Sequence, residues 1–222
     1  MEHQSVQPLS LCIWTRTPVH SIGFVIWNDR VLCGHLGEQD ESTLVRKLRE
    51  RLGKWATWNK GARRQLDRQV PNIGEIFDLT VRHDFLSGEL SVSPSESRLR
   101  VSLKHFIEAV DEYLAGRRFD FFDILLDLGN CPGFTRTVLH KCREIPYGQT
   151  MTYRELATAI GRPTAVRAVA QALAHNPIPL LIPCHRVIGS DGSLRGYSAA
   201  GGTETKRRLI QMEKSFHQAC GQ

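Results

Sequence analysis

The stretch Asn176–Pro183, which leads into Cys184, constrains the fold more than any other part of this sequence. Three prolines fix their own backbone φ angles there, and the apolar residues between them predict a buried strand or extended segment. Cys184 and His185 follow directly, so a thiol and an imidazole stand side by side on a stiff backbone. A neighbouring imidazole can keep part of the thiol in the thiolate form, which is the nucleophile. The alternative is a small buried core cysteine, since free cysteine is among the most buried residue types.

Basic residues are concentrated in the C-terminal part of the chain. Residues 1–135 hold 17 Lys and Arg against 18 Asp and Glu, whereas residues 136–222 hold 12 against 5. A neutral part joined to a part with a balance of +7 predicts a polyanion-binding surface in the C-terminal region. A merely solvated basic face is the alternative interpretation of the same counts.

Composition is typical of a globular protein, with 41% hydrophobic residues and a mean hydropathy of −0.27. No run of about 18 apolar residues predicts a membrane span. The first residues, Met1 to Gln4, lack the basic and then apolar layout of a signal peptide. We therefore expect a cytoplasmic protein without membrane contact, with access to the nucleus if the source is eukaryotic.

The six cysteines form no CxxC pair, and in a cytoplasmic chain we expect them to be reduced thiols. Several cysteines and histidines of the N-terminal part could in principle bind zinc. These are Cys12, His20, Cys33, His35 and His83. Their spacing matches no usual zinc-finger pattern, so we expect neither a metal nor a cofactor.

Strand patterns occur in the N-terminal part. Residues 10–16 and 22–36 alternate apolar and polar side chains, with Asn28-Asp29 as a hairpin turn. Residues 119–128 are apolar enough to form a further strand. Residues 54–100 are polar and rich in turn formers, and they show no clear organisation.

Apolar side chains at helical spacing predict three helices. The first covers 41–52 and ends at Gly53, and the second covers 99–114 and ends at Gly116. A third helix is expected over 135–145.

A helix-turn-helix follows. Thr152–Ile160 predicts a helix whose cap is Thr152 with Glu155 three residues on, the layout of a capping box. Residues 161–164 form a turn, and 165–174 predict a short second helix of small residues. Small residues let a backbone approach DNA closely.

Turn-forming residues at 129–133 suggest a boundary between two domains. We therefore expect an N-terminal domain over 1–131, a C-terminal domain over 132–216, and a tail over 217–222.

Five short blocks stand in order in the C-terminal part: Ile145–Tyr153, Arg167–Val169, Asn176-Pro177, Pro183–Val187 and Gly196-Tyr197. With this order and spacing, the chain resembles the O6-alkylguanine-DNA alkyltransferases, or methylated-DNA–protein-cysteine methyltransferases, from about Pro132 to about Glu213. Residues 1–131 resemble the N-terminal domain of that family only loosely.

The resemblance implies an α/β protein of two domains. The N-terminal domain would be a ribonuclease H-like α/β domain, with a small antiparallel sheet plus helices. The C-terminal domain would be mostly helical and winged-helix-like, with the helix-turn-helix as its DNA-binding part. The protein would act as a monomer on double-stranded DNA.

The same resemblance implies a DNA-repair methyltransferase that flips the damaged nucleotide out of the duplex. It would transfer an alkyl group, typically methyl, irreversibly from O6 of guanine to Cys184. The resemblance leaves open whether O4 of thymine is a second source of the alkyl group. A thioether has no carbonyl for water to attack, so each protein molecule would act once.

Catalytic roles follow from the resemblance. His185 would take the thiol proton through a water molecule, and Glu213 would orient the imidazole, as in a Cys-His-Glu triad. Arg186 would pair with a carboxylate and brace the loop. Tyr153 would donate to the flipped base as guanine leaves; the alternative for Tyr153 is an aromatic residue that packs on the core.

DNA-contact residues include Thr152, Tyr153, Arg167 and Ala168. The planar guanidinium of Arg167 would fill the space of the extruded base, and a simple phosphate contact is the alternative. In relatives, the position of Ala174 often carries a basic residue, so one phosphate contact is expected to be missing.

The substrate pocket and its hinge would involve Asn176, Val187, Tyr197 and Ser198. Asn176 would tie the second helix to the cysteine loop, although it could instead be a simple helix cap. The segment Gly196–Gly202 is longer than the common Gly-Tyr-x-Gly-Gly form, which leaves the pocket width open.

Other functions compete with this one. A thiol hydrolase would use the same Cys, His and Glu, but nothing in the sequence specifies an acyl substrate. A damage-binding relative without transferase activity would replace the cysteine, and Cys184 is present. A regulator that senses alkylation through Cys184 would be compatible with the transfer chemistry.

Overall fold

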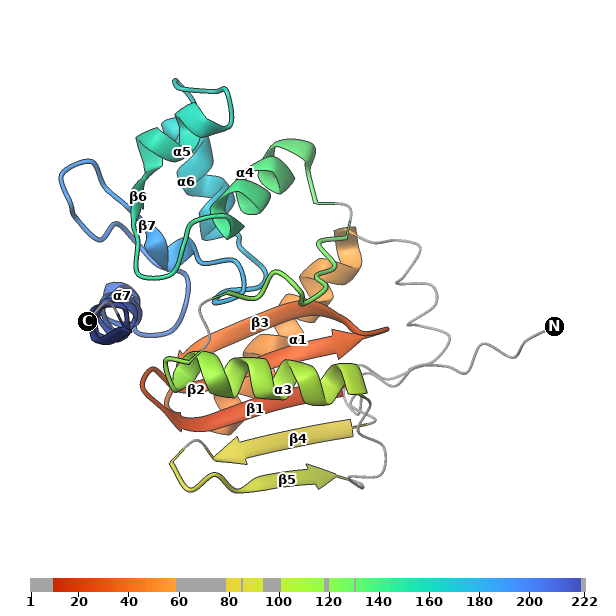
Figure 1. Cartoon of the computed structure of the whole chain (residues 1–222). Helices are drawn as coiled ribbons and strands as arrows, with labels where there is room; N and C mark the ends of the chain where they lie inside the picture. Colours follow the sequence, from red (N-terminus) through yellow and green to blue (C-terminus); the bar gives the residue numbers. More distant parts are fainter. Residues whose placement is uncertain are drawn as a thin grey trace.

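The computed structural model describes residues 10–58, 79–84, 86–93, 101–117, 120–129 and 131–220. Element labels follow Figure 1. The elements of the N-terminal part are β1 (Ser10–Thr17), β2 (His20–Trp27), β3 (Arg30–Glu38), α1 (Glu41–Trp58), β4 (Leu79–Asp84), β5 (Leu90–Ser93) and α3 (Val101–Leu114). Those of the C-terminal part are α4 (Gly133–Arg143), β6 (Met151–Thr152), α5 (Tyr153–Ala159), α6 (Val166–Ala174), a 3₁₀ turn η3 (Cys184–Arg186), β7 (Val187–Ile188) and α7 (Thr203–Cys220).

The N-terminal part is built on a five-stranded sheet with the strand order β3-β2-β1-β4-β5. The hairpin over β2 and β3 is confirmed, and Asn28 and Asp29 adopt the positive φ angles that its tight turn requires. The expected antiparallel sheet is wrong in one respect, because β1 pairs with β4 in parallel and the sheet is mixed. A parallel pair needs a long crossover, and here the chain between β1 and β4 passes through the hairpin and α1.

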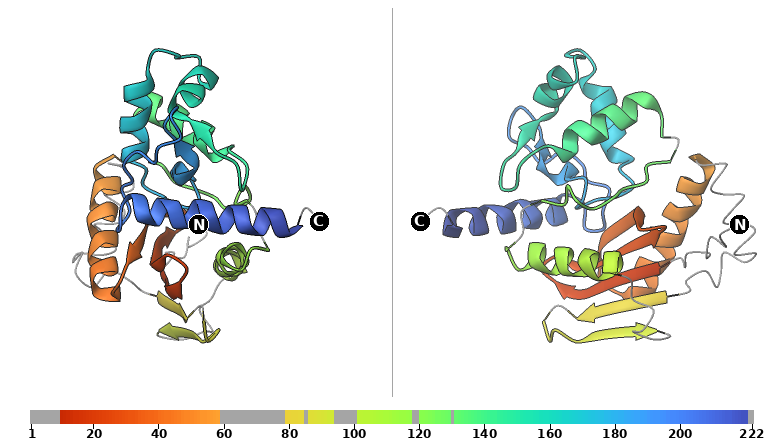
Figure 2. Two further views of the ribbon diagram at one scale, coloured as in Figure 1. Left: turned by 90° about the vertical axis from the view of Figure 1, so that its left-hand side faces the viewer. Right: turned by 45° about the vertical axis from the view of Figure 1, so that its right-hand side comes forward.

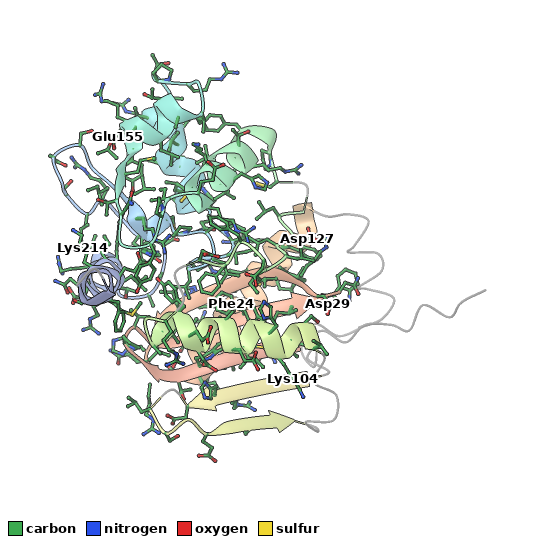
Figure 3. All side chains as sticks on the ribbon, in the orientation of Figure 1. Phe24, Asp29, Lys104, Asp127, Glu155 and Lys214 are labelled. Carbon is green, nitrogen blue, oxygen red and sulfur yellow. The ribbon has the colours of Figure 1, made fainter. Side chains whose placement is uncertain are left out.

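The two faces of the sheet pack against different helices. On β1, the side chains of Leu11 and Ile13 face α1, whereas Cys12 and Trp14 belong to the cluster that includes α3. Figure 2 shows α1 in orange and α3 in green on opposite sides of the strands. Phe24 lies on the α3 side, with its ring 5.4 Å from that of Phe106 (Figure 3). The alternation of apolar and polar side chains expected for these strands is wrong, because helices cover both faces of the sheet and nearly every side chain is buried.

Helix α1 begins where expected but does not end at Gly53. It continues to Trp58, and nothing lies within 4 Å of the position of a Cβ on Gly53. Trp55 is buried and its indole nitrogen donates to the backbone oxygen of Asp127 at 3.1 Å. The packing of Trp55 therefore keeps the last turns helical despite the cost of about 1 kcal/mol for a glycine in a helix.

Helix α3 confirms the second expected helix, and Gly116 follows its end with a φ of +73°. The strand expected over 119–128 is wrong. Among the described residues of that segment, pairing is limited to one bridge between Leu126 and Val31. A turn in which Ile124 N–H donates to Phe121 O, at 3.0 Å, breaks the extended conformation. Phe121, Ile124 and Leu128 pack on the core from a loop instead, whereas Phe122 and Leu125 are exposed.

The C-terminal part is mostly helical and lies above the sheet in Figure 1. Its first helix, α4, confirms the helix expected over 135–145, although it starts and ends two residues earlier. Helix α7 runs to Cys220, so the first four residues of the expected tail 217–222 are helical.

Two helices joined by a tight turn, α5 and α6, confirm the helix-turn-helix. Thr152 caps α5: its hydroxyl accepts from Glu155 N–H at 3.1 Å, and the Glu155 carboxylate accepts from Thr152 N–H at 2.7 Å. Gly161 continues the turn with a φ of +71°, which a glycine adopts without strain.

The two parts share one hydrophobic cluster. It extends from the strands of the sheet through α3 to α4, α5, α6 and α7. The division at residue 131 stays a prediction, since buried side chains run continuously across it. None of the helices in the described part of the chain is long and apolar enough to cross a membrane.

Candidate active site

The segment Asn176–Pro183 is buried along its whole length but forms no strand. Prolines remove three backbone donors, so a regular ladder cannot form. The segment turns instead, with Ile182 N–H donating to Ile178 O at 3.0 Å and Leu180 at a φ of +75°. It delivers Cys184 into η3, where only 5% of the cysteine is exposed.

Asn176 joins the end of α6 to the cysteine. Its side-chain nitrogen donates to the Sγ of Cys184 at 3.1 Å and to the backbone oxygen of Ile182 at 2.8 Å. Its side-chain oxygen accepts from Ile178 N–H at 3.1 Å, and its own N–H donates to Leu173 O at 3.1 Å. The sequence expected a hinge here, and the geometry places Asn176 in that position, beyond a simple helix cap.

Glu213 of α7 lies at the centre of a buried polar cluster beside the cysteine. Its Oε1 lies 2.8 Å from Nε2 of His185, which is fully buried. Arg186 donates from Nε to Oε2 at 2.9 Å and from Nη2 to Oε1 at 2.9 Å, so the two form a bidentate ion pair. The geometry thus joins Glu213 to His185, as the family resemblance implied, and Cys184 directly precedes His185 in η3.

Two further groups hold Glu213, and sequence reasoning missed both. The hydroxyl of Tyr113, from α3, donates to Oε1, and Gly148 N–H donates to Oε2 at 3.1 Å. Tyr113 looked like one more apolar position of an amphipathic helix, and no local signal distinguishes it. Burial alone would raise the pKa of the Glu213 carboxyl, but His185 and Arg186 outweigh it and lower that pKa well below its usual range.

The tautomer of His185 follows from this cluster. A carboxylate accepts hydrogen bonds only, so Nε2 carries the hydrogen and Nδ1 is the acceptor. Among the described residues, Nδ1 has no hydrogen-bond partner. Burial lowers the pKa of His185, partly offset by Glu213, so the imidazole is neutral at pH 7 and able to accept a proton at Nδ1.

The Cys184 thiol is held under opposing influences. Burial raises its pKa, whereas the amide of Asn176 and the positive charges of Lys206 and Arg51 lower it. The thiol is therefore protonated at rest, and groups that stabilise the thiolate surround it. Removing the proton requires a base, and His185 is the neighbouring residue in the chain.

Lys206 is a further residue that the sequence did not single out. It is fully buried, and its Nζ donates to the backbone oxygen of Val187 at 2.6 Å. The same ammonium lies 5.7 Å from the ring centroid of Tyr153. A lysine in an amphipathic helix usually faces solvent, so sequence alone could not place this one in the core.

Of the expected DNA-contact residues, Thr152 and Tyr153 are half-buried, and Arg167 and Ala168 are exposed. Burial raises the pKa of Tyr153, and the electrostatic influence of Cys184 raises it further. Arg167 and Ala168 occupy the first turn of α6, which contributes Val169 to the core and leaves this turn open to solvent. Arg154 and Arg162 are also exposed on the same two-helix unit.

The expected pocket residues occupy different environments. Val187 is buried, and Ser198 is exposed. Tyr197 is half-buried, its hydroxyl has no hydrogen-bond partner in the described part of the chain, and burial raises its pKa well above the usual value.

The longer loop after Tyr197 docks on the sheet. Ala200 N–H donates to Leu36 O at 3.2 Å, and Thr205 donates its hydroxyl to Ala200 O at 2.5 Å. Gly37 permits this approach, because a Cβ at that position would lie 2.4 Å from Ala200 O. The loop Gly196–Gly202 thus lies against β3, beside the candidate active site.

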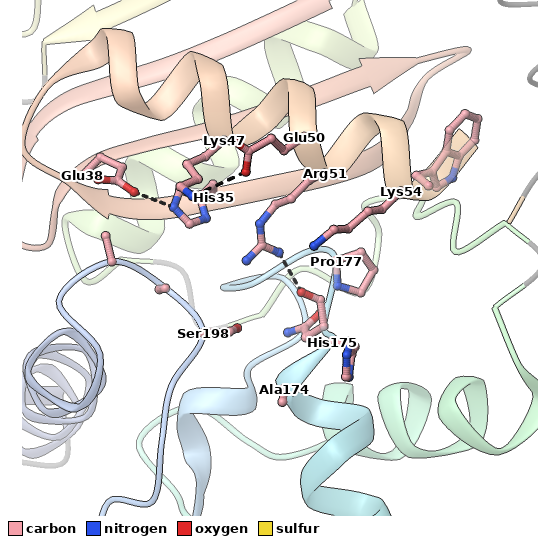
Figure 4. Close-up of a pocket in the computed structure, with 14 residues that line it drawn as sticks. His35, Glu38, Lys47, Glu50, Arg51, Lys54, Ala174, His175, Pro177 and Ser198 are labelled. Carbon is pink, nitrogen blue, oxygen red and sulfur yellow. Dashed lines mark hydrogen bonds and ion pairs between the residues drawn. The ribbon is translucent and has the colours of Figure 1, made fainter. Parts of the chain in front are cut away.

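A cavity of about 360 Å³ opens between α1, the end of α6 and this loop (Figure 4). Asn176 and Ser198 line it on one side, and Lys47, Arg51 and Lys54 line it on the other. It therefore contains two of the residues expected around the substrate pocket, together with basic side chains of the N-terminal part.

Among the described residues, no three His, Cys, Asp or Glu side chains come close enough to bind a metal ion. The cysteines considered as zinc ligands illustrate the reason. Cys12 and Cys33 lie in different clusters, on opposite faces of the sheet.

Known proteins were compared with this chain. A family profile described as "6-O-methylguanine DNA methyltransferase, DNA binding domain" matches residues 133–215. The methylated-DNA–protein-cysteine methyltransferase of Methanothermobacter thermautotrophicus is 41% identical over 119 residues, which cover 54% of this chain and 65% of that protein. The protein of the same name from Mycobacterium bovis is 43% identical over 130 residues, which cover 57% of this chain and 76% of that protein.

A solved structure shares the architecture over almost the whole chain. The crystal structure of Mycobacterium tuberculosis OGT in complex with DNA has 25% sequence identity and a TM-score of 0.60. The similarity covers 93% of this chain and 94% of that one. The match therefore includes the sheet as well as the helical part.

Proposed function

The chain belongs to the methylated-DNA–protein-cysteine methyltransferase family, and from that premise we propose that it repairs DNA by moving an alkyl group from O6 of guanine to Cys184. The similar proteins are named methylated-DNA–protein-cysteine methyltransferases, the matching profile is described as a 6-O-methylguanine DNA methyltransferase domain, and the solved relative was crystallised with DNA. The substrate class, the flipped nucleotide and the single turnover are the specific parts of this proposal.

One observation supports it above the others. A buried thiol accepts a hydrogen bond from Asn176, and the next residue is a neutral imidazole whose free nitrogen is Nδ1. The opposite nitrogen is held by Glu213, itself fixed by an arginine and a tyrosine. This arrangement leaves one buried acceptor, Nδ1 of His185, available to take the thiol proton, while the surrounding charges are paired.

The proposed reaction is a single displacement. The thiol proton of Cys184 passes through a water molecule to Nδ1 of His185, and Glu213 stabilises the imidazolium that forms. The sulfur then bonds to the alkyl carbon while the carbon–O6 bond breaks, and its electron pair leaves with guanine. Tyr153, half-buried beside Lys206, donates to the departing base and reduces the negative charge that develops there.

Access to the base requires that the nucleotide leave the stack. The exposed first turn of α6 offers Arg167 and Ala168 to the groove, and the planar guanidinium suits the vacated space in the duplex. The +7 balance of residues 136–222 supplies phosphate contacts. The affinity for DNA should therefore be salt-sensitive and largely independent of sequence.

The product explains why the protein would act once. A thioether has no carbonyl that water can attack, so hydrolysis cannot restore the thiol. A thiol hydrolase with the same three residues would pass through a thioester and would turn over.

Intact mass spectrometry tests the proposal. The protein is mixed with duplex DNA that contains one O6-methylguanine, and we expect a gain of one methyl group in place of the thiol proton, located on Cys184 by peptide mapping. The Cys184→Ala variant should bind the duplex and gain nothing, and Cys33→Ala should react like the unaltered protein. An unchanged mass for the unaltered protein, or more than one guanine repaired per molecule, would contradict the mechanism.

A further inference from the structure

Arg51 comes from α1, outside the part of the chain that carries the nucleophile, but its side chain ends beside the cysteine loop. Its Nη1 donates to the backbone oxygen of Asn176 at 2.9 Å, across 125 positions of sequence. Figure 4 shows the guanidinium pointing from α1 toward this carbonyl at the edge of the cavity. The side chain is half-buried, so the contact is not a fluctuating surface pair.

The carbonyl of Asn176 is the remaining polar group of a residue whose other polar groups bind within the C-terminal part. The side chain binds Ile178, Ile182 and the sulfur of Cys184, and the backbone N–H binds Leu173. Arg51 thus completes the set of contacts from outside. A hydrogen bond from a charged donor is roughly twice as strong as a neutral one.

The next carbonyl of the hinge is also held by the N-terminal part. Gly34 N–H, on β3, donates to Pro177 O at 2.9 Å. Two successive carbonyls are therefore anchored to two elements, α1 and β3, that pack against each other. Anchoring successive peptide groups fixes both the position and the rotation of the Asn176 backbone, and hence the direction of its side chain.

We propose that Arg51 is a positioning residue that holds Asn176 in the orientation in which its amide supports the Cys184 thiolate. This inference deepens the proposed function, because the thiol concerned is the acceptor of the alkyl group. It assigns the N-terminal part a share in the chemistry, in addition to its structural role. No local pattern indicated this role, since Arg51 occupies a polar position of an amphipathic helix.

Other charged and titratable groups face the thiol from every element around it. Lys206 of α7 and Arg51 of α1 are the cations, and both lower the pKa of Cys184. Cys142 of α4 and Tyr153 of α5 have pKa values raised by burial, so they are neutral at pH 7.

Two more groups complete the surroundings. Tyr197, in the loop, is also neutral because burial raises its pKa, and His185 is neutral because burial lowers its pKa. None of these neighbours changes its charge near neutral pH, so none of them compensates for the effect of an Arg51 substitution on the Cys184 thiol.

The test is the pH dependence of Cys184 alkylation by iodoacetamide, followed by peptide mass so that the other cysteines are resolved. Arg51→Ala should raise the midpoint by about one pH unit, which slows the reaction about tenfold at pH 7. Arg51→Lys keeps the charge but lacks the planar guanidinium, so its midpoint should lie between those of the unaltered protein and the Arg51→Ala variant. Arg46→Ala removes the same charge from an exposed position of α1, where it pairs with Glu50, and should leave the midpoint unchanged.

A double-mutant cycle separates action through Asn176 from a direct effect of charge. Arg51→Lys should have no effect in an Asn176→Ala background, because the amide that it positions is gone. The lysine variant keeps the charge and most of the packing, so it also serves if the alanine variant does not fold.

Two results would overturn the inference: an unshifted midpoint in both Arg51 variants, or an effect of Arg51→Lys that is equally large with and without Asn176. Methyl transfer from O6-methylguanine duplex is measured in parallel. Its failure in the unaltered protein would contradict the proposed function and would leave the iodoacetamide result, and hence this inference, standing on its own.

Discussion

The core of the sheet and the surroundings of Cys184 are both buried, but the first is made of apolar side chains and the second contains polar and charged ones. Between the sheet and α1, the core contains Cys33 among leucines, valines and tryptophans. Burial raises the pKa of Cys33 to about 12, with Arg51 opposing it slightly. Around Cys184, where burial also raises the pKa, an amide and two cations partly offset that effect. Burial by itself makes a thiol inert, and the directed polar contacts make one of these two thiols a candidate nucleophile.

The same contrast holds for stability. The sheet core has no charged group that must be matched, whereas the site buries Glu213, Arg186 and Lys206 together. A buried charge is tolerated only when every partner is in place, since an unpaired one costs several kcal/mol. Changes in the sheet should therefore alter stability alone, and changes in the site should alter stability and chemistry together.

The largest effect should come from the sheet. Phe24→Ala removes a fully buried ring that packs edge-on against Trp14 and Phe106, and should lower the free energy of unfolding by roughly 3–5 kcal/mol. Phe122→Ala, where the ring is 59% exposed, should cost at most about 1 kcal/mol. Urea denaturation measures both. Alkylation of Cys184 in the folded Phe24 variant should keep its pH midpoint; a shifted midpoint would mean that the two regions are not independent.

Glu213→Gln should have the second-largest effect, and it should lower both the free energy of unfolding and the rate of methyl transfer. The substitution keeps the shape but leaves Arg186 as a buried, unpaired charge, which lowers the free energy of unfolding by roughly 3 kcal/mol. Methyl transfer should fall as well, because His185 loses the carboxylate that stabilises its protonated form. Glu204→Gln, on the exposed side of the same helix, breaks pairs with Arg207 and Arg208 and should cost less than about 1 kcal/mol. Unaltered transfer in the Glu213 variant would show that the carboxylate is only structural.

The smallest expected effect is on the pH dependence of the free energy of unfolding. Burial lowers the pKa of His185 in the folded protein, so between that value and the unfolded value of about 6.5 the unfolded chain binds the extra proton. Stability is therefore complete above about pH 7 and declines on acidification, by at most about 1.4 kcal/mol per pH unit for one proton. His185→Gln should show a shallower decline between pH 7 and 5, and His35, whose pKa burial also lowers, accounts for a remaining slope. Denaturation midpoints at several pH values give both slopes; parallel slopes would mean that folding does not change the pKa of His185.

Local sequence determined the regular elements of this protein because each depends on neighbours in the chain. The hairpin of β2 and β3, the capping box at Thr152 and the glycine end of α3 all involve contacts within a few residues. The Cys-His pair and the basic C-terminal part were equally visible, as was the link of Glu213 to His185 through the family resemblance.

Only the tertiary structure decided the remainder. The parallel pairing of β4, the loop at 120–129 and the continuation of α1 past Gly53 depend on packing against distant segments, which override local preference. The same is true of Tyr113 on Glu213 and Arg51 on Asn176, which meet across 100 and 125 positions of sequence. A side chain that reaches a site from another element follows no periodic pattern, so its role depends on the three-dimensional arrangement of the elements and not on its neighbours in the chain.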